Sequence, residues 1–178
     1  MEPFHDVRAQ YLAHRAEIDA ALRAVLESGS YILGATLERF ERAFAEYLGA
    51  PHVVGVASGT AALELALRAL DIGPGDEVAI PALTAVPTAM AVWSVGAALR
   101  VVDVDLETYT LDPEALEREL TPAVKAIVPV HLYGGMADQG AIAAIAARRG
   151  IPVIEDAAQA HGASSGALGS SRRPTALR

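Results

Sequence analysis

Residues 153–162 read Val-Ile-Glu-Asp-Ala-Ala-Gln-Ala-His-Gly, a short apolar run that ends in an acid and then an amide. The run has the pattern of a buried strand, and in an open parallel sheet ligands bind outside the carboxyl ends of the strands. Asp156 and Gln159 would therefore face one ligand. A carboxylate there can pair with a protonated ring nitrogen through a charge-assisted hydrogen bond of about 1.5–3 kcal/mol, and an amide can donate to a phenolate oxygen. The alternative is that Asp156 caps the strand end and Gln159 is solvated.

Further runs of valine and isoleucine recur along the chain and predict a parallel sheet. They are continuous rather than alternating, which is typical of strands that are buried on both faces. Helical periodicity separates them, as at Leu63, Ala66, Leu67 and Leu70. The pattern is a series of β-α-β units, so we expect an α/β fold. The expected strands cover residues 52–56, 77–80, 100–104, 126–130 and 152–154.

The sequence predicts three segments. Residues 1–50 form a helical segment with two apolar stripes. Residues 51–162 form the β-α-β part, and residues 163–178 are a divergent tail, rich in serine, that we expect to be disordered. The two stripes consist of Ile18, Leu22, Val25 and Leu26, then Leu37, Phe40 and Phe44.

The composition excludes several classes of function. Hydrophobic residues make up 52% of the chain and charged residues 20%, as in an ordered α/β protein. The net charge of -8 disfavours nucleic acid or an anionic membrane as the main partner, because both need clustered basic residues. Without cysteine the chain has no disulfides and no thiolate metal sites. No apolar leader or run of about 18 apolar residues occurs, so we expect a cytoplasmic protein.

Ser58-Gly59-Thr60-Ala61 lies where a predicted strand turns into a predicted helix. Backbone N–H groups and the helix dipole would converge there on an anion such as a phosphate, and the Thr60 hydroxyl adds a donor. The alternative is that Ser58 is an ordinary helix N-cap and Gly59 a tight-turn residue.

Five motifs occur along the chain in a fixed order. They are Tyr31-Ile32-Leu33-Gly34, Ser58-Gly59-Thr60, Gly73-Pro74-Gly75-Asp76-Glu77-Val78, Val130-His131-Leu132-Tyr133-Gly134 and Glu155-Asp156-Ala157-Ala158-Gln159-Ala160-His161-Gly162. In order and spacing they resemble one family, the DegT/DnrJ/StrS nucleotide-sugar aminotransferases, which depend on pyridoxal 5'-phosphate (PLP). The resemblance covers nearly all of the chain up to about Gly169.

The resemblance implies the large domain of a fold type I PLP-dependent transferase, with a mostly parallel sheet between helical layers. It implies an incomplete domain, since several strands and a smaller C-terminal domain of the family are missing. It also implies a homodimer that moves an amino group from an amino acid to a keto-sugar nucleotide, in polysaccharide or secondary-metabolite biosynthesis. Thr60 and Ala61, beside Gly59, match the residues that cup the cofactor phosphate. Asp156 matches the partner of the pyridine nitrogen, and Gln159 matches the contact to the phenolic oxygen.

Ala85 is a first departure from the family pattern. The family usually has an aromatic residue at this position, which stacks on the pyridine ring. Loss of that partner removes about 0.5–1.5 kcal/mol beyond the buried area, or around tenfold in affinity. We therefore expect weak binding of PLP.

The second departure is the lysine that forms the internal Schiff base, which in the family follows Asp156 in a Ser-Phe-x-x-x-Lys-like segment. The sequence has one lysine, Lys125, which precedes the strand predicted at 126–130 and would lie exposed at the amino edge of the sheet. We therefore expect non-covalent PLP binding and a truncated chain that is inactive alone, with no catalytic residue. The alternative is a non-catalytic fragment that only associates with itself or with a full-length homologue.

Three other groups of polar residues have simpler interpretations. Asp103-Val104-Asp105 has the spacing of metal-dependent glycosyltransferases, which form a third functional class, but a turn at a strand end is the preferred interpretation. His131 and His161 lack a second convergent ligand, so we expect hydrogen-bonded structural histidines.

Overall fold

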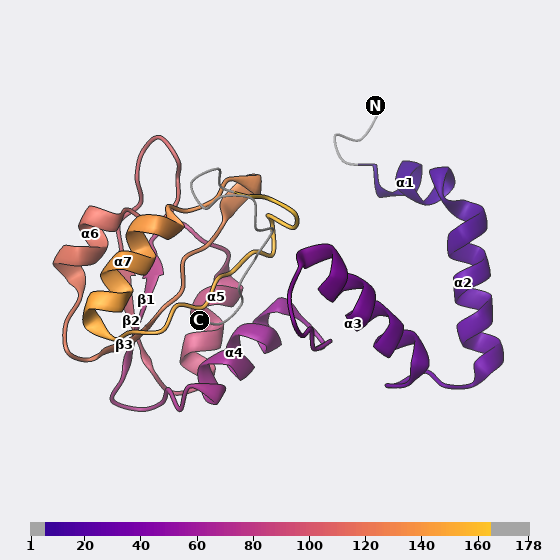
Figure 1. The fold of residues 1–178 in the computed structure, drawn as a ribbon, viewed down its shortest axis with the longest axis horizontal. Coiled ribbons are helices and arrows are strands. Elements are labelled where there is room, and N and C mark those ends of the chain that lie inside the picture. The colour runs from indigo at the N-terminus through magenta and orange to yellow at the C-terminus, as the bar shows by residue number, and fades with distance from the viewer. Residues whose placement is uncertain (1–5, 165–178) are drawn as a thin grey trace. The chain divides into compact units, whose positions relative to one another are not determined.

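The chain folds as two units, which a computed structural model describes over residues 6–164. The first unit ends at Phe44 and the second begins at Ala45. The first is helical, and the second contains the sheet (Figure 1).

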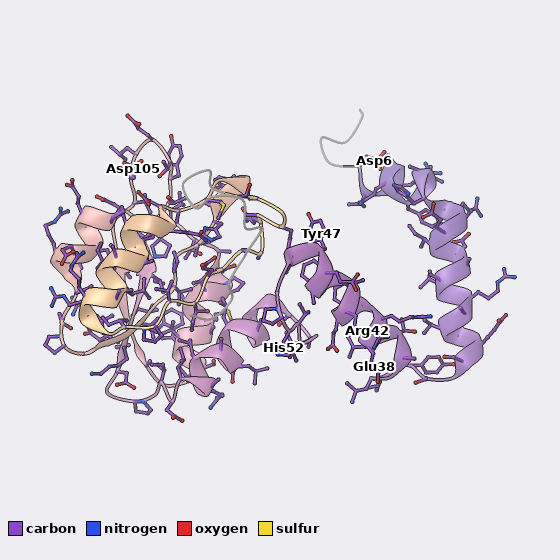
Figure 2. All side chains as sticks on the ribbon, viewed as in Figure 1. Asp6, Glu38, Arg42, Tyr47, His52 and Asp105 are labelled. Carbon is purple, nitrogen blue, oxygen red and sulfur yellow. The ribbon has the colours of Figure 1, made fainter. Side chains whose placement is uncertain are left out.

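Polar caps and exposed side chains characterise the first unit. Asp6 starts the first helix by accepting hydrogen bonds from two first-turn N–H groups at 3.0 and 3.1 Å (Figure 2). Gly29 ends the second helix in the left-handed conformation that favours glycine. Phe40 and Phe44 of the predicted stripe stack with ring centroids 5.5 Å apart. No residue of the three helices is buried. In the two apolar stripes, Leu22, Leu26 and Phe40 are exposed and the other four residues are half-buried. These helices are α1 (Val7–Ala13), α2 (Arg15–Ser28) and α3 (Ala35–Leu48), of which α3 continues into the second unit.

A parallel sheet of order β2-β1-β3 forms the centre of the second unit. The central strand places Val78 opposite Leu99 and Ala126. On the other side of β3, residues 152–156 continue the sheet through parallel bridges from Ile127 to Val153 and from Val130 to Asp156. The strands are β1 (Glu77–Pro81), β2 (Ala98–Val102) and β3 (Val124–Ile127).

Helices cover both faces of this sheet, which gives three layers. The pair α4 and α5 packs on one face, and the pair α6 and α7 packs on the other (Figure 1). Neighbouring strand residues alternate between the two layers: Val78 and Ile80 contact the first layer, and Ala79 contacts the second. Both sets of side chains are therefore apolar, which confirms the interpretation of the continuous runs. The helices are α4 (Gly59–Ala69), α5 (Val86–Ser94), α6 (Pro113–Glu119) and α7 (Gln139–Arg149).

The strand predicted at residues 52–56 is wrong. The segment is not a strand, and Val54 and Val56 are 77% and 41% exposed. A buried strand needs a neighbouring strand and cover on its faces. Among the described residues, no strand pairs with residues 52–56, and Val53 is no more than half-buried.

The other four predicted strands are present with shifted bounds. The strand expected at 100–104 is β2, which ends at Val102, because Val104 forms an antiparallel bridge with Leu111 instead. The strand expected at 126–130 begins as β3 two residues earlier, and 152–154 takes part through isolated bridges.

None of the helices within residues 6–164 is both long and apolar enough to span a bilayer. The tail predicted at 163–178 lies, from residue 165 onward, outside the described residues.

Candidate functional site

Asp156 lies at the carboxyl edge of the sheet with its carboxylate oriented by two hydrogen bonds. The hydroxyl of Thr88 donates to Oδ2 at 3.1 Å, and the N–H of Ala158 donates to Oδ1 at 3.2 Å. The backbone of Asp156 is also paired, since its N–H donates to the carbonyl of Pro129 and its carbonyl accepts from the N–H of His131. Each carboxylate oxygen retains a further lone pair for a ligand.

A second threonine extends this hydrogen-bonded chain. The hydroxyls of Thr84 and Thr88 lie 2.8 Å apart, and Thr88 is almost fully buried. A hydroxyl has one proton to donate, and Thr88 gives its proton to Asp156, so Thr84 is the donor to Thr88. Hydrogen bonds that run in one direction polarise and strengthen each other. Sequence reasoning missed Thr88, although a threonine four residues after Thr84 on an apolar helix was a usable signal.

Ala85 directly follows Thr84 and is the N-cap of α5, with an exposed side chain and no capping hydrogen bond. The threonine chain therefore connects the turn that carries Ala85 to the carboxylate of Asp156.

Gln159 is oriented by the backbone of a neighbouring loop. Its Oε1 accepts a hydrogen bond from the N–H of Tyr133 at 2.9 Å, in the short 3-10 helix η1 (Leu132–Gly134). The side-chain oxygen is thereby occupied, and the Nε2 amino group is left to donate. Gln159 is exposed, so this donor is accessible to a ligand.

The N-terminus of α4 keeps donors that its cap does not use. Ser58 accepts at Oγ from the N–H of Ala61 at 3.2 Å, which confirms the N-cap interpretation. Within residues 6–164 the N–H groups of Gly59 and Thr60 have no acceptor. A Cβ placed on Gly59 would meet no atom within 4 Å, so the space beside this glycine is open. Two N–H groups and the positive end of the helix dipole suit an anion.

The structure brings only some of the predicted site residues into contact. Hydrogen bonds through Thr88 and Thr84 connect Asp156 to the turn that carries Ala85, and Gln159 comes three residues after Asp156 in the chain. No hydrogen bond among the described residues joins Gly59, Thr60 or Ala61 to Asp156. The helix that they begin, α4, packs beside α5.

Lys125 lies away from this edge. It is the second residue of β3, near the amino end of the strand, and it is exposed. Its Nζ donates to the carbonyl of Pro122 at 2.9 Å. The structure thus places Lys125 where the sequence predicts it.

The Asp103-Val104-Asp105 segment forms the predicted turn. Asp105 lies on a loop that projects from the second unit (Figure 2), and its Oδ1 accepts from the N–H groups of Thr108 and Glu107 at 2.8 and 3.0 Å. These hydrogen bonds, that from Thr108 first, lower the pKa of the Asp105 carboxyl below its ordinary value. No group of three or more possible metal ligands occurs in the part of the chain that the structure describes.

The two histidines differ in their surroundings. His131 is 2% exposed and fully hydrogen-bonded, which confirms the structural interpretation for this residue. His161 is exposed and lies just after the candidate site in the chain.

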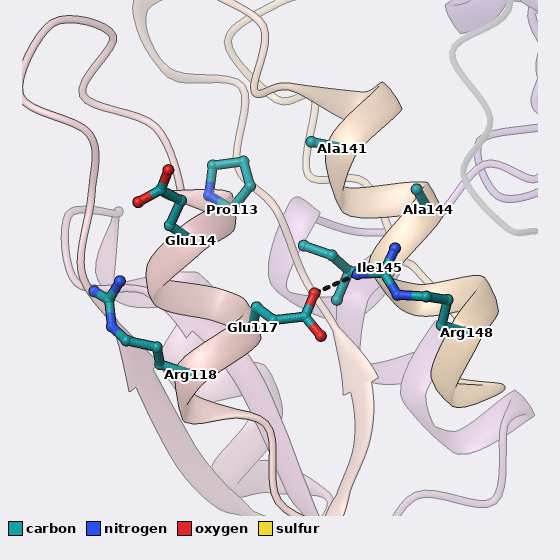
Figure 3. Close-up of a pocket in the computed structure, with 8 residues that line it drawn as sticks. All are labelled: Pro113, Glu114, Glu117, Arg118, Ala141, Ala144, Ile145 and Arg148. Carbon is teal, nitrogen blue, oxygen red and sulfur yellow. Dashed lines mark hydrogen bonds and ion pairs between the residues drawn. The ribbon is translucent and has the colours of Figure 1, made fainter.

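A separate hollow of about 520 Å³ lies between α6 and α7 (Figure 3). Glu117 and Arg148 form an ion pair across it. It belongs to the outer helical layer and contains none of the predicted cofactor residues. Its lining consists of Pro113, Glu114, Glu117, Arg118, Ala141, Ala144, Ile145 and Arg148.

Residues 13–170 match the model of the DegT/DnrJ/EryC1/StrS aminotransferase family. The chain belongs to this family. Asp156 and Gln159 belong to the last of the five motifs and lie at or just beyond the carboxyl edge of the sheet. The three layers are those of part of a fold type I large domain.

Two similar proteins are aminotransferases of dTDP- and UDP-linked sugars. The dTDP-3-amino-3,4,6-trideoxy-alpha-D-glucose transaminase of Streptomyces venezuelae is 50% identical over 90% of this chain and 42% of its own length. The UDP-2-acetamido-2-deoxy-3-oxo-D-glucuronate aminotransferase of Pseudomonas aeruginosa is 48% identical over 92% of this chain and 46% of its own. The chain therefore spans less than half the length of these relatives.

Solved structures of family members share the fold. S. venezuelae DesV superposes with a TM-score of 0.88 at 50% identity, over 90% of this chain and 43% of DesV. NtdA of Bacillus subtilis, solved with its cofactor PMP bound, gives a TM-score of 0.83 at 38% identity, over 89% of this chain and 36% of NtdA.

The threonine chain yields a test of how Asp156 is positioned. Thr88→Val removes the hydroxyl and keeps the volume, so the free energy of unfolding should fall by about 1.5–3 kcal/mol, the value for a hydrogen bond to a charged group. The matched control Thr88→Ser keeps the hydroxyl and should lose less, about 1 kcal/mol for the missing methyl. Urea unfolding followed by circular dichroism measures both. A valine variant as stable as the serine variant would contradict the assignment.

Proposed function

We propose that these residues form the PLP-binding part of an aminotransferase that acts on keto-sugar nucleotides. The observation that carries the proposal is the carboxylate of Asp156, which the buried Thr88 hydroxyl orients at the carboxyl edge of the sheet in a chain of this family. The amino donor is an amino acid, and the pathway is polysaccharide or secondary-metabolite sugar biosynthesis in a cytoplasmic setting. The dTDP- and UDP-sugar enzymes among the relatives support this substrate class.

The donor set of the site fits PLP group by group. The N–H groups of Gly59 and Thr60, with the Thr60 hydroxyl and the capped start of the helix at Ala61, present donors to a phosphate. Asp156 offers a carboxylate to a protonated pyridine nitrogen, and Gln159 offers Nε2 to a phenolic oxygen. Bound PLP supplies an electron sink at the reacting carbon, and the protein's residues hold it and keep its nitrogen protonated.

We propose no covalent bond between PLP and a lysine of these residues. Lys125 lies near the amino end of β3, and its Nζ is hydrogen-bonded to Pro122. We propose that the 178-residue chain binds PLP without a covalent link and does not complete amino transfer by itself.

Titration with PLP, followed by borohydride reduction and mass analysis, tests this proposal. Saturable binding without a lysine adduct is expected, with no turnover of amino donor and keto-sugar nucleotide. Asp156→Asn should weaken PLP binding by about ten- to a hundredfold, because it removes the charge-assisted hydrogen bond. The matched control Asp105→Asn removes a carboxylate that is occupied by its own turn and makes no hydrogen bond with Asp156, Thr88 or Gln159, so it should leave the Kd unchanged. A stoichiometric adduct on Lys125, or equal Kd values for the two variants, would overturn the proposal.

Ala85 gives a second test, of affinity. We propose that PLP binds weakly because this exposed N-cap residue has no ring to stack on the pyridine. Ala85→Tyr should therefore tighten PLP binding by up to about tenfold, as measured by the change in cofactor absorbance. Met90→Tyr, at an exposed position further along α5, is the control and should have no effect. A tyrosine at residue 85 that weakens binding would argue against a stacking position.

The exposed stripe of the first unit supports self-association. Leu22 and Leu26 of α2 are 58% and 66% exposed, and Ile32 is 86% exposed. We propose that the chain forms a homo-oligomer through such surfaces. The alternative function is a non-catalytic one, in which the chain only associates with itself or with a full-length homologue and binds no cofactor. Light scattering should give a mass above that of the monomer, and Leu22→Asp with Leu26→Asp should lower it while Glu17→Ala does not. A monodisperse wild-type monomer would exclude self-association.

A further inference from the structure

The donor that orients Gln159 belongs to a loop with an unfavourable backbone. Tyr133 has φ 55°, a left-handed conformation that a side chain with a Cβ rarely adopts. The loop is tightened by a hydrogen bond from the N–H of Gly135 to the carbonyl of Leu132 at 2.8 Å. A strained residue of this kind persists only where its surroundings impose the conformation.

The side chain of His131 closes this loop. Its Nδ1 accepts a hydrogen bond from the N–H of Ala137 at 3.1 Å, so one ring joins the start of the loop to its end. The backbone N–H of His131 donates to the carbonyl of Asp156 at 2.9 Å. One buried residue thus connects the strand that carries Asp156 to the loop that contacts Gln159.

The contacts of the ring also define its tautomer. Because Nδ1 is an acceptor, a neutral ring carries its proton on Nε2. Nε2 faces Oε2 of Glu155 at 3.4 Å, and Nε2 of Gln139 donates to the same carboxylate oxygen at 2.6 Å. Nε2 of Gln139 also lies 3.2 Å from Nε2 of the ring, and with the ring proton there it gives its N–H to Glu155 and not to the ring. Glu155 therefore holds the ring in the orientation that presents Nδ1 to Ala137.

We propose that His131 is a positioning residue for Gln159. It holds the 131–137 loop closed, the loop presents the N–H of Tyr133, and that N–H turns the Gln159 amide so that Nε2 is the free donor. The role of Nε2 as a donor to a ligand rests on the proposed function, since its acceptor would be the phenolic oxygen of PLP. The closure of the loop by His131 needs no PLP.

Two substitutions at residue 131 separate the two sides of the ring. His131→Asn keeps an acceptor near the position of Nδ1 and removes the group that faces Glu155. His131→Gln keeps a polar group near the position of Nε2 and leaves the N–H of Ala137 without its acceptor. Amide hydrogen exchange at Tyr133, measured by NMR on the full chain without PLP, should be about tenfold faster in the glutamine variant, and close to wild type in the asparagine variant. Equal exchange in the two variants would overturn the proposal.

Cofactor affinity supplies a readout that a purely structural role would not move. The Kd for PLP should rise about tenfold in His131→Gln, and this rise should vanish in the background of Gln159→Ala, because His131 acts through that amide. A rise that is unchanged in the Gln159→Ala background would overturn the link to Gln159. If wild-type chain binds no PLP, the proposed function fails, and exchange at Tyr133 still decides the role of His131.

The wild-type chain gives a test that needs no variant to fold. The ¹⁵N spectrum of the imidazole should show Nδ1 without a proton and Nε2 protonated, with Nδ1 hydrogen-bonded. The opposite tautomer would overturn the proposal, because a protonated Nδ1 cannot accept from Ala137.

Discussion

The backbone pairing between the end of β3 and residues 152–156 is the interaction on which the candidate site depends. The N–H of Asp156 donates to Pro129 at 3.0 Å, and the N–H of His131 donates to Asp156 at 2.9 Å. This register turns Asp156 toward Thr88 of α5 and Glu155 toward Gln139 of α7. A slip of one residue would exchange the two acids between the helical layers, because side chains alternate along an extended chain. The carboxylate of Asp156 would then lie in the helical layer that contains His131.

The two edges of the sheet have different roles. At the carboxyl edge the polar groups retain free lone pairs or N–H donors, as Asp156, Gln159 and the start of α4 show. At the amino edge the charges satisfy each other, since Arg100 binds Glu77 at 2.9 Å and Thr121 donates to the same carboxylate. Lys125 belongs to that second edge. The groups that remain open to a ligand therefore lie at the carboxyl edge, whereas the Nζ of Lys125 is hydrogen-bonded to the carbonyl of Pro122.

Local pattern was sufficient to predict most of the helices and strands of the second unit. The continuous apolar runs at 77–80 and 126–130 predicted strands covered on both faces, and helices indeed cover both. The run at 52–56 has the same pattern and is exposed, because no neighbouring strand in the described residues pairs with it. A run of apolar residues indicates that a segment can be buried, but it does not show whether a neighbouring strand is present to pair with it. Thr88 was missed for a related reason, since its partner Asp156 lies 68 residues away in the chain.

The amino-acid sequence by itself determined the β-α-β order, the family and the types of group at the site, because these follow from periodicity and from motifs of adjacent residues. The order of the strands, the direction of the Thr84–Thr88–Asp156 chain and the closure of the 131–137 loop by His131 were decided only by the tertiary structure. These depend on hydrogen bonds between groups that are distant in sequence. Such bonds exist only once the register of the sheet has brought the groups within about 3 Å of each other.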